Sequence, residues 1–326
     1  MASATLLLPA RTRLVGAPLP ETMARALGRA DRLSGGEPGE RAQLLRHFQL
    51  LPRGWPAAAL TRQMDVGDAA GAQWLRADPA WVRPDINGAR LFACAEGMQL
   101  VQADVDALLP ALRPLFGDLG FPIDAPNPAR WYLRLPPGTP LPVFVAPEDA
   151  LGADLLDSLD ATTTGADAVS RRWRVLLNEA QVVLHTHPWN ERRVAAGKPP
   201  VNSLWFWGGG QLPDHVSSPH AAVQADDTLL RALAAQAGLA LAPYAPRFRL
   251  PATAALCDLR ELRDPDALCA DWLAPALDAL RRGELARLQL DFADGEGYLL
   301  LRPQRWRWWR RPVREFAAAP ARPTSA

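Results

Sequence analysis

One short stretch of the chain, from Leu177 to Gln211, concentrates side chains that are able to do chemistry. The candidate residues in it are His187, Asn190, Arg193, Asn202, Trp207, Gly208 and Gly210. Arginine and asparagine side chains, with the backbone amides of a glycine loop, suit carboxylate or phosphate groups. The alternative is structural, because asparagines often hydrogen-bond turn backbone and glycines fit turns where a Cβ would clash. We call this stretch the candidate block.

The predicted elements place the candidate block around the end of a buried strand. Apolar residues at helical spacing over Ala168–His185 predict an amphipathic helix, and Asn190 is a suitable N-cap for a short helix over Glu191–Ala196. Val201–Trp207 is typical of a buried strand, and the three glycines that follow are expected to form a loop at its carboxyl end. Ligands bind at that end of strands in α/β proteins, which supports a binding role, but the sequence favours the structural alternative for both the asparagines and the glycines.

A metal site is a second interpretation, because four of the five histidines fall close together in the sequence. They are His185, His187, His215 and His220. Imidazole nitrogens are common zinc ligands, but the first two flank a helix end and the second two lie across a loop. Spacing without geometry identifies a metal site poorly, so the sequence favours no metal and no other cofactor.

A third candidate is the C-terminal run Arg305–Arg311, in which tryptophans and arginines are interleaved. Such a run is typical of segments that contact a membrane surface or nucleic acid. The sequence favours a structural alternative, in which the tryptophans pack on the core and the arginines cover their rings through cation–π contacts. The formal net charge of +1 also gives no electrostatic reason to expect nucleic acid or a membrane as a partner.

Length and composition indicate a globular α/β protein. Of the 326 residues, 48% are hydrophobic and 22% are charged, and no apolar run approaches the roughly 18 residues that cross a bilayer. The first residues, MASATLLLPAR, predict a buried strand rather than a signal peptide. Three widely spaced cysteines argue against a disulfide framework and predict a cytoplasmic location.

Alternating helices and strands predict an α/β core with a mainly parallel sheet and a smaller inserted α+β domain. The core is expected over residues 1–64 and 151–316, and the insert over residues 65–150. Within the insert, Asn87 and Gly88 predict a hairpin turn, and Val101–Phe116 predicts a long amphipathic helix. Residues 317–326 are expected to be a disordered tail.

The order and spacing of residues in the candidate block resemble a known family. The matching positions are His187-Pro188, Asn190, Arg193, Gly197, Asn202, Trp205, Trp207-Gly208 and Gly210. They resemble the archaeal-type cofactor-independent phosphoglycerate mutases of the alkaline phosphatase superfamily, and most of all a bacterial branch that includes RpfE-type regulatory proteins. The resemblance implies an alkaline phosphatase-like core, a lid-like inserted domain and a ligand-binding role for the block.

The catalytic equipment that this resemblance implies is largely missing. The family holds a metal ion with an Asp-Gly pair after its first strand, where this chain has Pro9-Ala10-Arg11. Ser34 lies in surroundings unlike those of the family's nucleophilic serine, and Thr162–Gly165 stands where the family has a histidine and an acid. No histidine follows His220 to supply C-terminal ligands. Two-metal phosphoryl transfer needs many oxygen and nitrogen donors, so no catalytic residue is identified.

The sequence therefore predicts a phosphoglycerate mutase-related pseudoenzyme that binds a small phosphorylated or carboxylate ligand or a regulatory protein partner. One alternative is an active mutase, or a metal-dependent phosphatase, that uses manganese or zinc. The other is an interaction protein without a ligand. Activity with added Mn²⁺ separates the first alternative from the rest, and stabilisation by phosphorylated metabolites separates a ligand-binding protein from one without a ligand.

Overall fold

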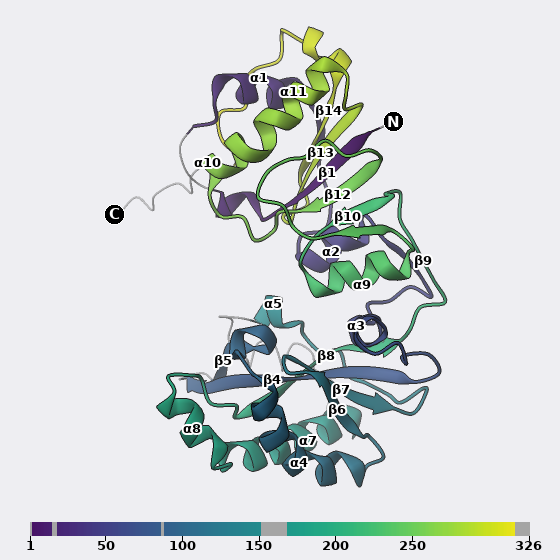
Figure 1. The fold of residues 1–326 in the computed structure, drawn as a ribbon, viewed down its shortest axis with the longest axis vertical. Coiled ribbons are helices and arrows are strands. Elements are labelled where there is room, and N and C mark those ends of the chain that lie inside the picture. Colours follow the sequence, from purple (N-terminus) through teal and green to yellow (C-terminus); the bar gives the residue numbers. More distant parts are fainter. Residues whose placement is uncertain (1, 15–17, 86–87, 151–167, 317–326) are drawn as a thin grey trace. The chain divides into compact units, whose positions relative to one another are not determined.

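The chain forms two compact units, shown as ribbons in Figure 1. The structure is a computed structural model that describes residues 2–14, 18–85, 88–150 and 168–316. The first unit comprises residues 1–50 and 215–326, and the second comprises residues 51–214. These bounds differ from the expected division after residues 64 and 150, because the strand of the candidate block pairs with a strand of the second unit. Within the described ranges, no helix is long and apolar enough to cross a membrane.

The first unit is built on a seven-stranded sheet that is mainly parallel, as the sequence predicts. Five neighbouring strands are parallel, and two antiparallel strands complete one edge. In spatial order they are β11 (Ala240–Ala242), β10 (Ala222–Gln224), β12 (Ala254–Asp258), β1 (Ser3–Leu8), β13 (Arg287–Phe292), β14 (Gly297–Leu301) and β2 (Asp31–Leu33). A separate pair is formed by β3 (Gln49–Leu51) and β9 (His215–Ser217).

The two faces of this sheet differ in chemistry, because successive side chains of a strand point to opposite faces. Leu6 and Leu290 belong to the apolar face, which packs against α1 and α11 (Figure 1). The other face is polar in its middle, where the register places Thr5 beside Gln289 and Leu7 beside Asp291. The helices of this unit are η1 (Arg11–Arg13), α1 (Glu21–Arg29), α2 (Glu40–Leu45), α9 (Thr228–Gln236), α10 (Pro265–Ala267), η3 (Leu268–Leu273), α11 (Ala274–Arg282) and η4 (Arg302–Trp306).

The second unit is a five-stranded antiparallel sheet with helices on both faces (Figure 1). Leu75 and Phe206 pack with α4 and α7 on one face, whereas Trp74 and Tyr132 pack with α3 on the other. The strands are β4 (Gln73–Asp85), β5 (Gly88–Cys94), β6 (Ile123–Asn127), β7 (Arg130–Leu135) and β8 (Ser203–Gln211). The helices are α3 (Ala57–Asp65), η2 (Ala95–Met98), α4 (Gln102–Gly117), α5 (Pro147–Ala150), α7 (Ala168–His185) and α8 (Trp189–Ala195).

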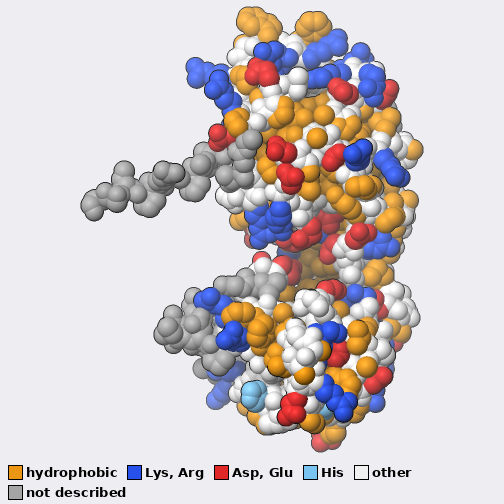
Figure 2. Space-filling view, turned by 60° about the vertical axis from the view of Figure 1, so that its left-hand side comes forward, with side chains coloured by type: hydrophobic (Ala, Val, Ile, Leu, Met, Phe, Trp, Pro, Cys, Tyr) orange, Lys and Arg blue, Asp and Glu red, His pale blue; other side chains and the backbone are white. Residues whose placement is uncertain are grey.

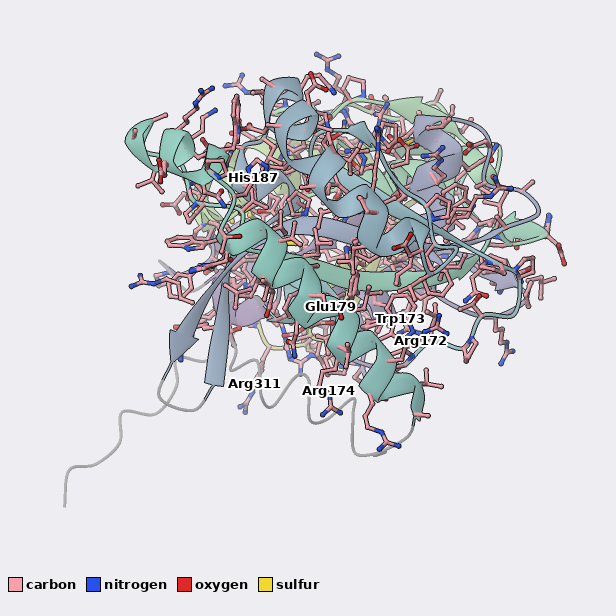
Figure 3. All side chains as sticks on the ribbon, turned by 90° about the horizontal axis from the view of Figure 1, so that it is seen from below. Arg172, Trp173, Arg174, Glu179, His187 and Arg311 are labelled. Atoms are coloured by element: carbon pink, nitrogen blue, oxygen red, sulfur yellow. The ribbon has the colours of Figure 1, made fainter. Side chains whose placement is uncertain are left out.

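The two helices with the clearest apolar period are the best predicted elements. The bounds of α7 are those expected, and those of α4 differ from the expected helix by one residue at each end. On α7, Trp173 is buried and stacks on Phe121 with ring centroids 5.7 Å apart, whereas Arg174 and Glu179 are exposed (Figure 3). The amphipathic period was sufficient to identify the buried face.

Three predictions about the candidate block are wrong. Helix α8 begins at Trp189, so Asn190 lies inside the helix and does not cap it. The glycines Gly208 to Gly210 are part of β8 and pair with β4, so they do not form a loop after the strand. Strand β8 itself is antiparallel and belongs to the second unit, not to the parallel sheet.

The C-terminal tryptophans do not pack on the core as expected, although the predicted cation–π contact is present at Trp306, where Arg305 lies 4.9 Å from the ring centroid. Trp306, Trp308 and Trp309 are exposed, because the segment after β14 continues along the surface as η4 and then without regular structure. Three further predictions lie outside the described residues. They concern the centre of the hairpin turn at residues 86–87, the segment Thr162–Gly165 and the tail at residues 317–326.

Candidate functional site

The asparagines of the candidate block are engaged by the backbone of the second unit. Asn190 Nδ2 donates to the carbonyls of Leu184, at 2.8 Å, and Val201, at 2.9 Å, and its Oδ1 accepts from the Val201 amide at 2.8 Å. Asn202 brackets Val82 in the same way, with bonds of 2.9 and 2.7 Å. The two side-chain amides therefore bind the residues just before β8 to neighbouring backbone. This is the structural role that the sequence offered as the alternative to ligand binding.

Arg193 is 2% exposed and is held by groups of its own unit. Its Nε donates to the Pro199 carbonyl at 3.0 Å, its Nη2 donates to the Met98 carbonyl at 2.7 Å, and its Nη1 lies 2.9 Å from Asp104 Oδ2. Burial opposes ionisation of Asp104, but hydrogen bonds from Trp189, the Val101 amide and Arg193 outweigh it, so the pKa of this carboxyl is lowered. Arg193 thus joins α8 to the start of α4.

Trp207 belongs to a buried ionic cluster beneath α3. Its Nε1 donates to Asp78 Oδ2 at 2.7 Å, and Arg76 Nε donates to Asp78 Oδ1 at 2.8 Å. The guanidinium of Arg76 lies over the rings of Trp207 and Tyr132, with its carbon 5.0 and 5.4 Å from their centroids. Burial opposes the charge of Arg76, and the Asp78 carboxylate outweighs that effect, so the pKa of Arg76 is raised. The pair is fully enclosed, since Asp78 is 0% exposed.

The glycines of the block allow α3 to approach β8 closely. A Cβ at Gly208 would lie 2.8 Å from Ala57 Cβ, and one at Gly210 would lie 2.7 Å from Pro56 Cβ. Gly208 also has φ +65°, a conformation that other residues rarely adopt. Packing therefore accounts for the glycine run, and an anion-binding role for its amides stays a prediction.

The histidines of the predicted metal site do not form one cluster. His185 and His187 belong to the second unit, where His187 Nδ1 accepts from the Trp189 amide at 3.2 Å, and His215 and His220 belong to the first. Within the ranges that the structure describes, no three or more histidines, cysteines or acids are placed to hold a metal ion. The histidine that does meet His220 is His47, which sequence spacing did not single out.

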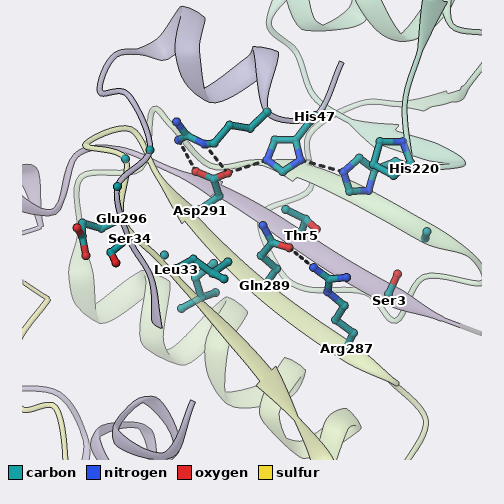
Figure 4. Close-up of a pocket in the computed structure, with 18 residues that line it drawn as sticks. Ser3, Thr5, Leu33, Ser34, His47, His220, Arg287, Gln289, Asp291 and Glu296 are labelled. Carbon is teal, nitrogen blue, oxygen red and sulfur yellow. Dashed lines mark hydrogen bonds and ion pairs between the residues drawn. The ribbon is translucent and has the colours of Figure 1, made fainter. Parts of the chain in front are cut away.

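A cavity of about 520 Å³ lies on the polar face of the first unit's sheet (Figure 4). Strands β1 and β13 form its floor, and its remaining walls include the loop after β2, the end of α2 and the segment before β10. The polar and charged side chains that line it are Ser3, Thr5, Ser34, Arg46, His47, His220, Arg287, Gln289, Asp291 and Glu296. Its volume is that of a site for a small molecule.

A chain of hydrogen bonds runs along one wall of this cavity (Figure 4). Asp291 accepts from Arg46 through bonds of 2.6 and 3.1 Å, and its Oδ2 lies 2.8 Å from His47 Nε2. His47 Nδ1 lies 3.2 Å from His220 Nε2. These contacts form one continuous chain from Arg46 through Asp291 and His47 to His220.

Burial and charge set the protonation of this chain. Burial opposes ionisation of Asp291, but hydrogen bonds from His47 and Arg46 outweigh it and lower the pKa of the carboxyl. Burial, with the neighbouring His47, lowers the pKa of His220 to about 4. The wall therefore presents a neutral imidazole at neutral pH. No sequence signal joins its members, because Asp291 lies 244 residues after His47.

The carboxyl ends of the parallel strands carry acids that converge on an arginine. Arg260, which is 6% exposed, forms two bonds of 2.8 Å with Asp258 at the end of β12. It also lies 3.1 Å from Asp227, which caps α9, and 3.3 Å from Glu40 at the start of α2. Burial of Arg260 is outweighed by these carboxylates, which raise its pKa. Beside them, Arg11 binds Asp294 at 2.8 Å.

This edge does not fit the metal centre that the family resemblance implies. A divalent ion needs free carboxylate or imidazole donors, but Asp258, Asp227 and Glu40 already surround a guanidinium that keeps its charge at all ordinary pH values. A second cation among them would face the positive charge of Arg260. The donor set is that of a structural ion-pair network.

Comparison with known proteins finds short similarities to phosphoglycerate mutases. No protein-family model matches the chain. A probable 2,3-bisphosphoglycerate-independent phosphoglycerate mutase of Geobacter sulfurreducens is 39% identical over 69 residues, which are 21% of this chain and 16% of that protein. The 2,3-bisphosphoglycerate-independent phosphoglycerate mutase of Methanosarcina barkeri is 47% identical over 38 residues, which are 12% of this chain and 10% of that protein. The chain is thus similar to these mutases over a small part of their length.

Two solved structures resemble a larger part of the chain. A cofactor-independent phosphoglycerate mutase from Thermoplasma acidophilum has a TM-score of 0.41 at 14% identity, with 92% of this chain and 89% of that one covered. A protein from Pyrococcus horikoshii has a TM-score of 0.42 at 12% identity, with 92% and 87% covered. Scores below 0.5 do not establish a common fold.

Proposed function

We propose that this chain is a phosphoglycerate mutase-related protein of the RpfE-type regulatory branch that does not catalyse metal-dependent phosphoryl transfer. Its function is to bind a small phosphorylated or carboxylate ligand, and through it to act on a regulatory partner. The short similarities to 2,3-bisphosphoglycerate-independent mutases support the relationship. The observation that carries the proposal is Arg260, whose guanidinium occupies the place where three carboxylates converge.

The loss of metal chemistry follows from that arrangement. Two-metal phosphoryl transfer requires cations about 4 Å apart, each held by several oxygen or nitrogen donors. At the carboxyl edge of this sheet, Asp258 is bound on both oxygens by Arg260, and Asp294 is bound by Arg11. These arginines supply the positive charge that balances the acids, so no step of a metal-assisted reaction is available to the described residues there.

The cavity of the first unit is the site that fits a small anion. Arg287 lines it, hydrogen-bonds Gln289 Oε1 at 2.6 Å, and forms no ion pair with the described residues. Arg46 uses four of its five N–H donors on Asp291 and neighbouring carbonyls, so Arg287 is the guanidinium with more donors available. Arg287 shares the floor of the cavity with Ser3 and Thr5, whose hydroxyls are further donors for an anion.

Two measurements on the full chain test the proposal. Metal analysis of the purified protein and a phosphoglycerate mutase assay with added Mn²⁺ are expected to show no stoichiometric metal and no turnover. Bound manganese or zinc together with turnover would refute it.

The ligand is tested by thermal shift with 3-phosphoglycerate, inorganic phosphate and citrate as probes. A ligand at 100 times its dissociation constant stabilises the folded state by about 2.7 kcal/mol. The shift is expected to disappear in Arg287→Ala and to persist in Arg249→Ala, a matched change at an exposed arginine outside the cavity. Equal shifts in both variants, or none with any probe in the wild type, would reject the cavity as the ligand site.

A further inference from the structure

Three tryptophans in the C-terminal segment of the first unit have most of their side-chain surface exposed. Trp306, Trp308 and Trp309 are 67%, 78% and 64% exposed. Tryptophan is usually well buried, and contiguous exposed apolar surface of a few hundred Å² commonly marks an interaction site. We call residues 302–311, which include these tryptophans and five arginines, the Trp/Arg segment.

A groove with an apolar floor and a basic rim adjoins this segment. Its volume is about 260 Å³, and it lies between α1, α11 and the end of β14. Leucines supply the apolar lining, namely Leu277, Leu280, Leu300 and Leu301. Arginines supply the rim, namely Arg25, Arg29, Arg281, Arg302 and Arg305. The groove therefore combines hydrocarbon and positive charge within one site, as an anionic amphiphile requires.

The charge of this rim is only partly balanced inside the protein. Arg25 pairs with Glu21 and Arg281 pairs with Asp278, both as exposed contacts. Arg29, Arg302 and Arg305 form no ion pair with residues in the described part of the chain. Arg29 Nη1 donates to the Arg305 carbonyl at 3.0 Å, and Arg305 lies over the Trp306 ring, 4.9 Å from its centroid. Neither contact supplies a negative charge, so the positive charge of these three guanidinium groups has no carboxylate to balance it within the described ranges.

We propose that the Trp/Arg segment and the adjoining groove bind the surface of a bilayer that contains anionic phospholipid. Indole rings favour the boundary between headgroups and acyl chains, and arginines beside them pair with lipid phosphates. The arginines at the rim of the groove bind one headgroup phosphate, and the leucines of its floor contact part of an acyl chain. In Figure 1 the yellow C-terminal segment lies at the top of the first unit, and Figure 2 shows hydrophobic and basic side chains together at that end.

Details of the aromatic residues favour a bilayer over nucleic acid. Trp308 and Trp309 pack edge to face, with an interplanar angle of 83° and centroids 6.0 Å apart. Bases stack on aromatic faces set out along a strand, and this mutual packing does not provide such a series. The leucine floor of the groove likewise offers nothing to a sugar-phosphate backbone. Exposed tryptophans surrounded by arginines are the combination that suits the interface between lipid headgroups and acyl chains.

The test is co-sedimentation of the full chain with vesicles of neutral phosphatidylcholine alone and of phosphatidylcholine with 30% phosphatidylglycerol. Binding is expected only with the anionic vesicles and is expected to weaken as salt rises. The variant Trp306→Ala/Trp308→Ala/Trp309→Ala is expected to lower partitioning at least about tenfold, because tryptophan at the interface supplies the apolar contact. The matched control, Phe92→Ala/Val182→Ala, removes exposed apolar side chains of the second unit and is expected to bind like the wild type.

Two additional experiments test insertion of the tryptophans and selectivity for anionic lipid separately. Brominated acyl chains are expected to quench wild-type tryptophan fluorescence on anionic vesicles, which also tests insertion if the triple variant folds poorly. Arg302→Ala/Arg305→Ala is expected to lose anionic selectivity, whereas Arg249→Ala retains it. Equal binding to both vesicle types, undiminished binding of the triple variant, or binding of a single-stranded oligonucleotide without vesicle binding would overturn the proposal. Self-association lost in the triple variant, without vesicle binding, would assign the surface to a second copy instead.

Discussion

Removal of the Arg260 side chain tests the ion-pair network at the carboxyl edge of the sheet. In Arg260→Leu the guanidinium is lost while Asp258, Asp227 and Glu40 remain. Leucine fills part of the space and offers no donor. The three carboxylates then face one another around an apolar group, which is the least favourable environment for ionised acids.

The size of the effect follows from exposure. The side chains of Arg260 and Asp258 are 7% and 10% exposed, and breaking a buried pair of this kind costs about 3–5 kcal/mol. Glu40 and Asp227 are 32% and 41% exposed, so water screens their contacts and each adds below about 1 kcal/mol. The free energy of unfolding should therefore fall by about 4 kcal/mol, a large share of the 5–15 kcal/mol typical of folded proteins.

The control variant removes the Asp258 carboxylate together with the Arg260 guanidinium. Replacing a buried pair with apolar residues is often close to neutral, so Arg260→Leu/Asp258→Leu should recover about 2 kcal/mol or more relative to the single variant. Burial raises the pKa of Glu40 in the wild type, and loss of the Arg260 charge, which opposes that effect, raises it further. The single variant should therefore gain stability, relative to the wild type, as pH falls from about 7 to 5.

Urea unfolding at both pH values, followed by circular dichroism, measures these differences. A loss of less than about 1 kcal/mol at pH 7 would show that Arg260 does not neutralise a buried acid cluster. A double variant as unstable as the single one would show that the cost lies in packing, not in uncompensated charge.

Three further predictions concern single positions. The pKa of His220 is lowered to about 4, so on acidification the unfolded chain takes up a proton before the folded chain does, and the free energy of unfolding should fall as pH drops from about 6.5 to 4. After allowance for the partial exposure of this side chain, the loss is about 1–2 kcal/mol. The variant His220→Asn should abolish this pH dependence in a pH series of thermal melts. Gly208→Ala should cost about 3 kcal/mol in urea unfolding, because its Cβ would meet Ala57, whereas Gly71→Ala, also at positive φ but in open space, should cost about 1 kcal/mol. Asn190→Ala should cost about 2–4 kcal/mol in urea unfolding through the loss of three buried hydrogen bonds, and a loss below about 1 kcal/mol would contradict its role as a backbone clamp.

Periodicity predicted the elements well, but it could not predict which strands pair. The apolar spacing over residues 168–185 defined α7, and the sequence also predicted the mainly parallel sheet. It did not indicate that β8 pairs with β4, because a buried strand shows the same apolar run in either kind of sheet. The sequence also could not predict the wall of the cavity, because His47, His220 and Asp291 are far apart in the chain and are brought together only by the fold.

The arginines of this chain separate into those that have an acid and those that do not. Arg76, Arg193 and Arg260 are buried, and each one is matched to a carboxylate within 3 Å. Because a guanidinium keeps its charge, a fold that buries it must also bring an acid close to it, and each of these pairs lies within a single unit. Arg302 and Arg305 have no such acid within the described ranges, and they lie beside exposed tryptophans. The proposed contact with anionic phospholipid gives these arginines phosphate groups to pair with and gives the exposed tryptophans an apolar cover.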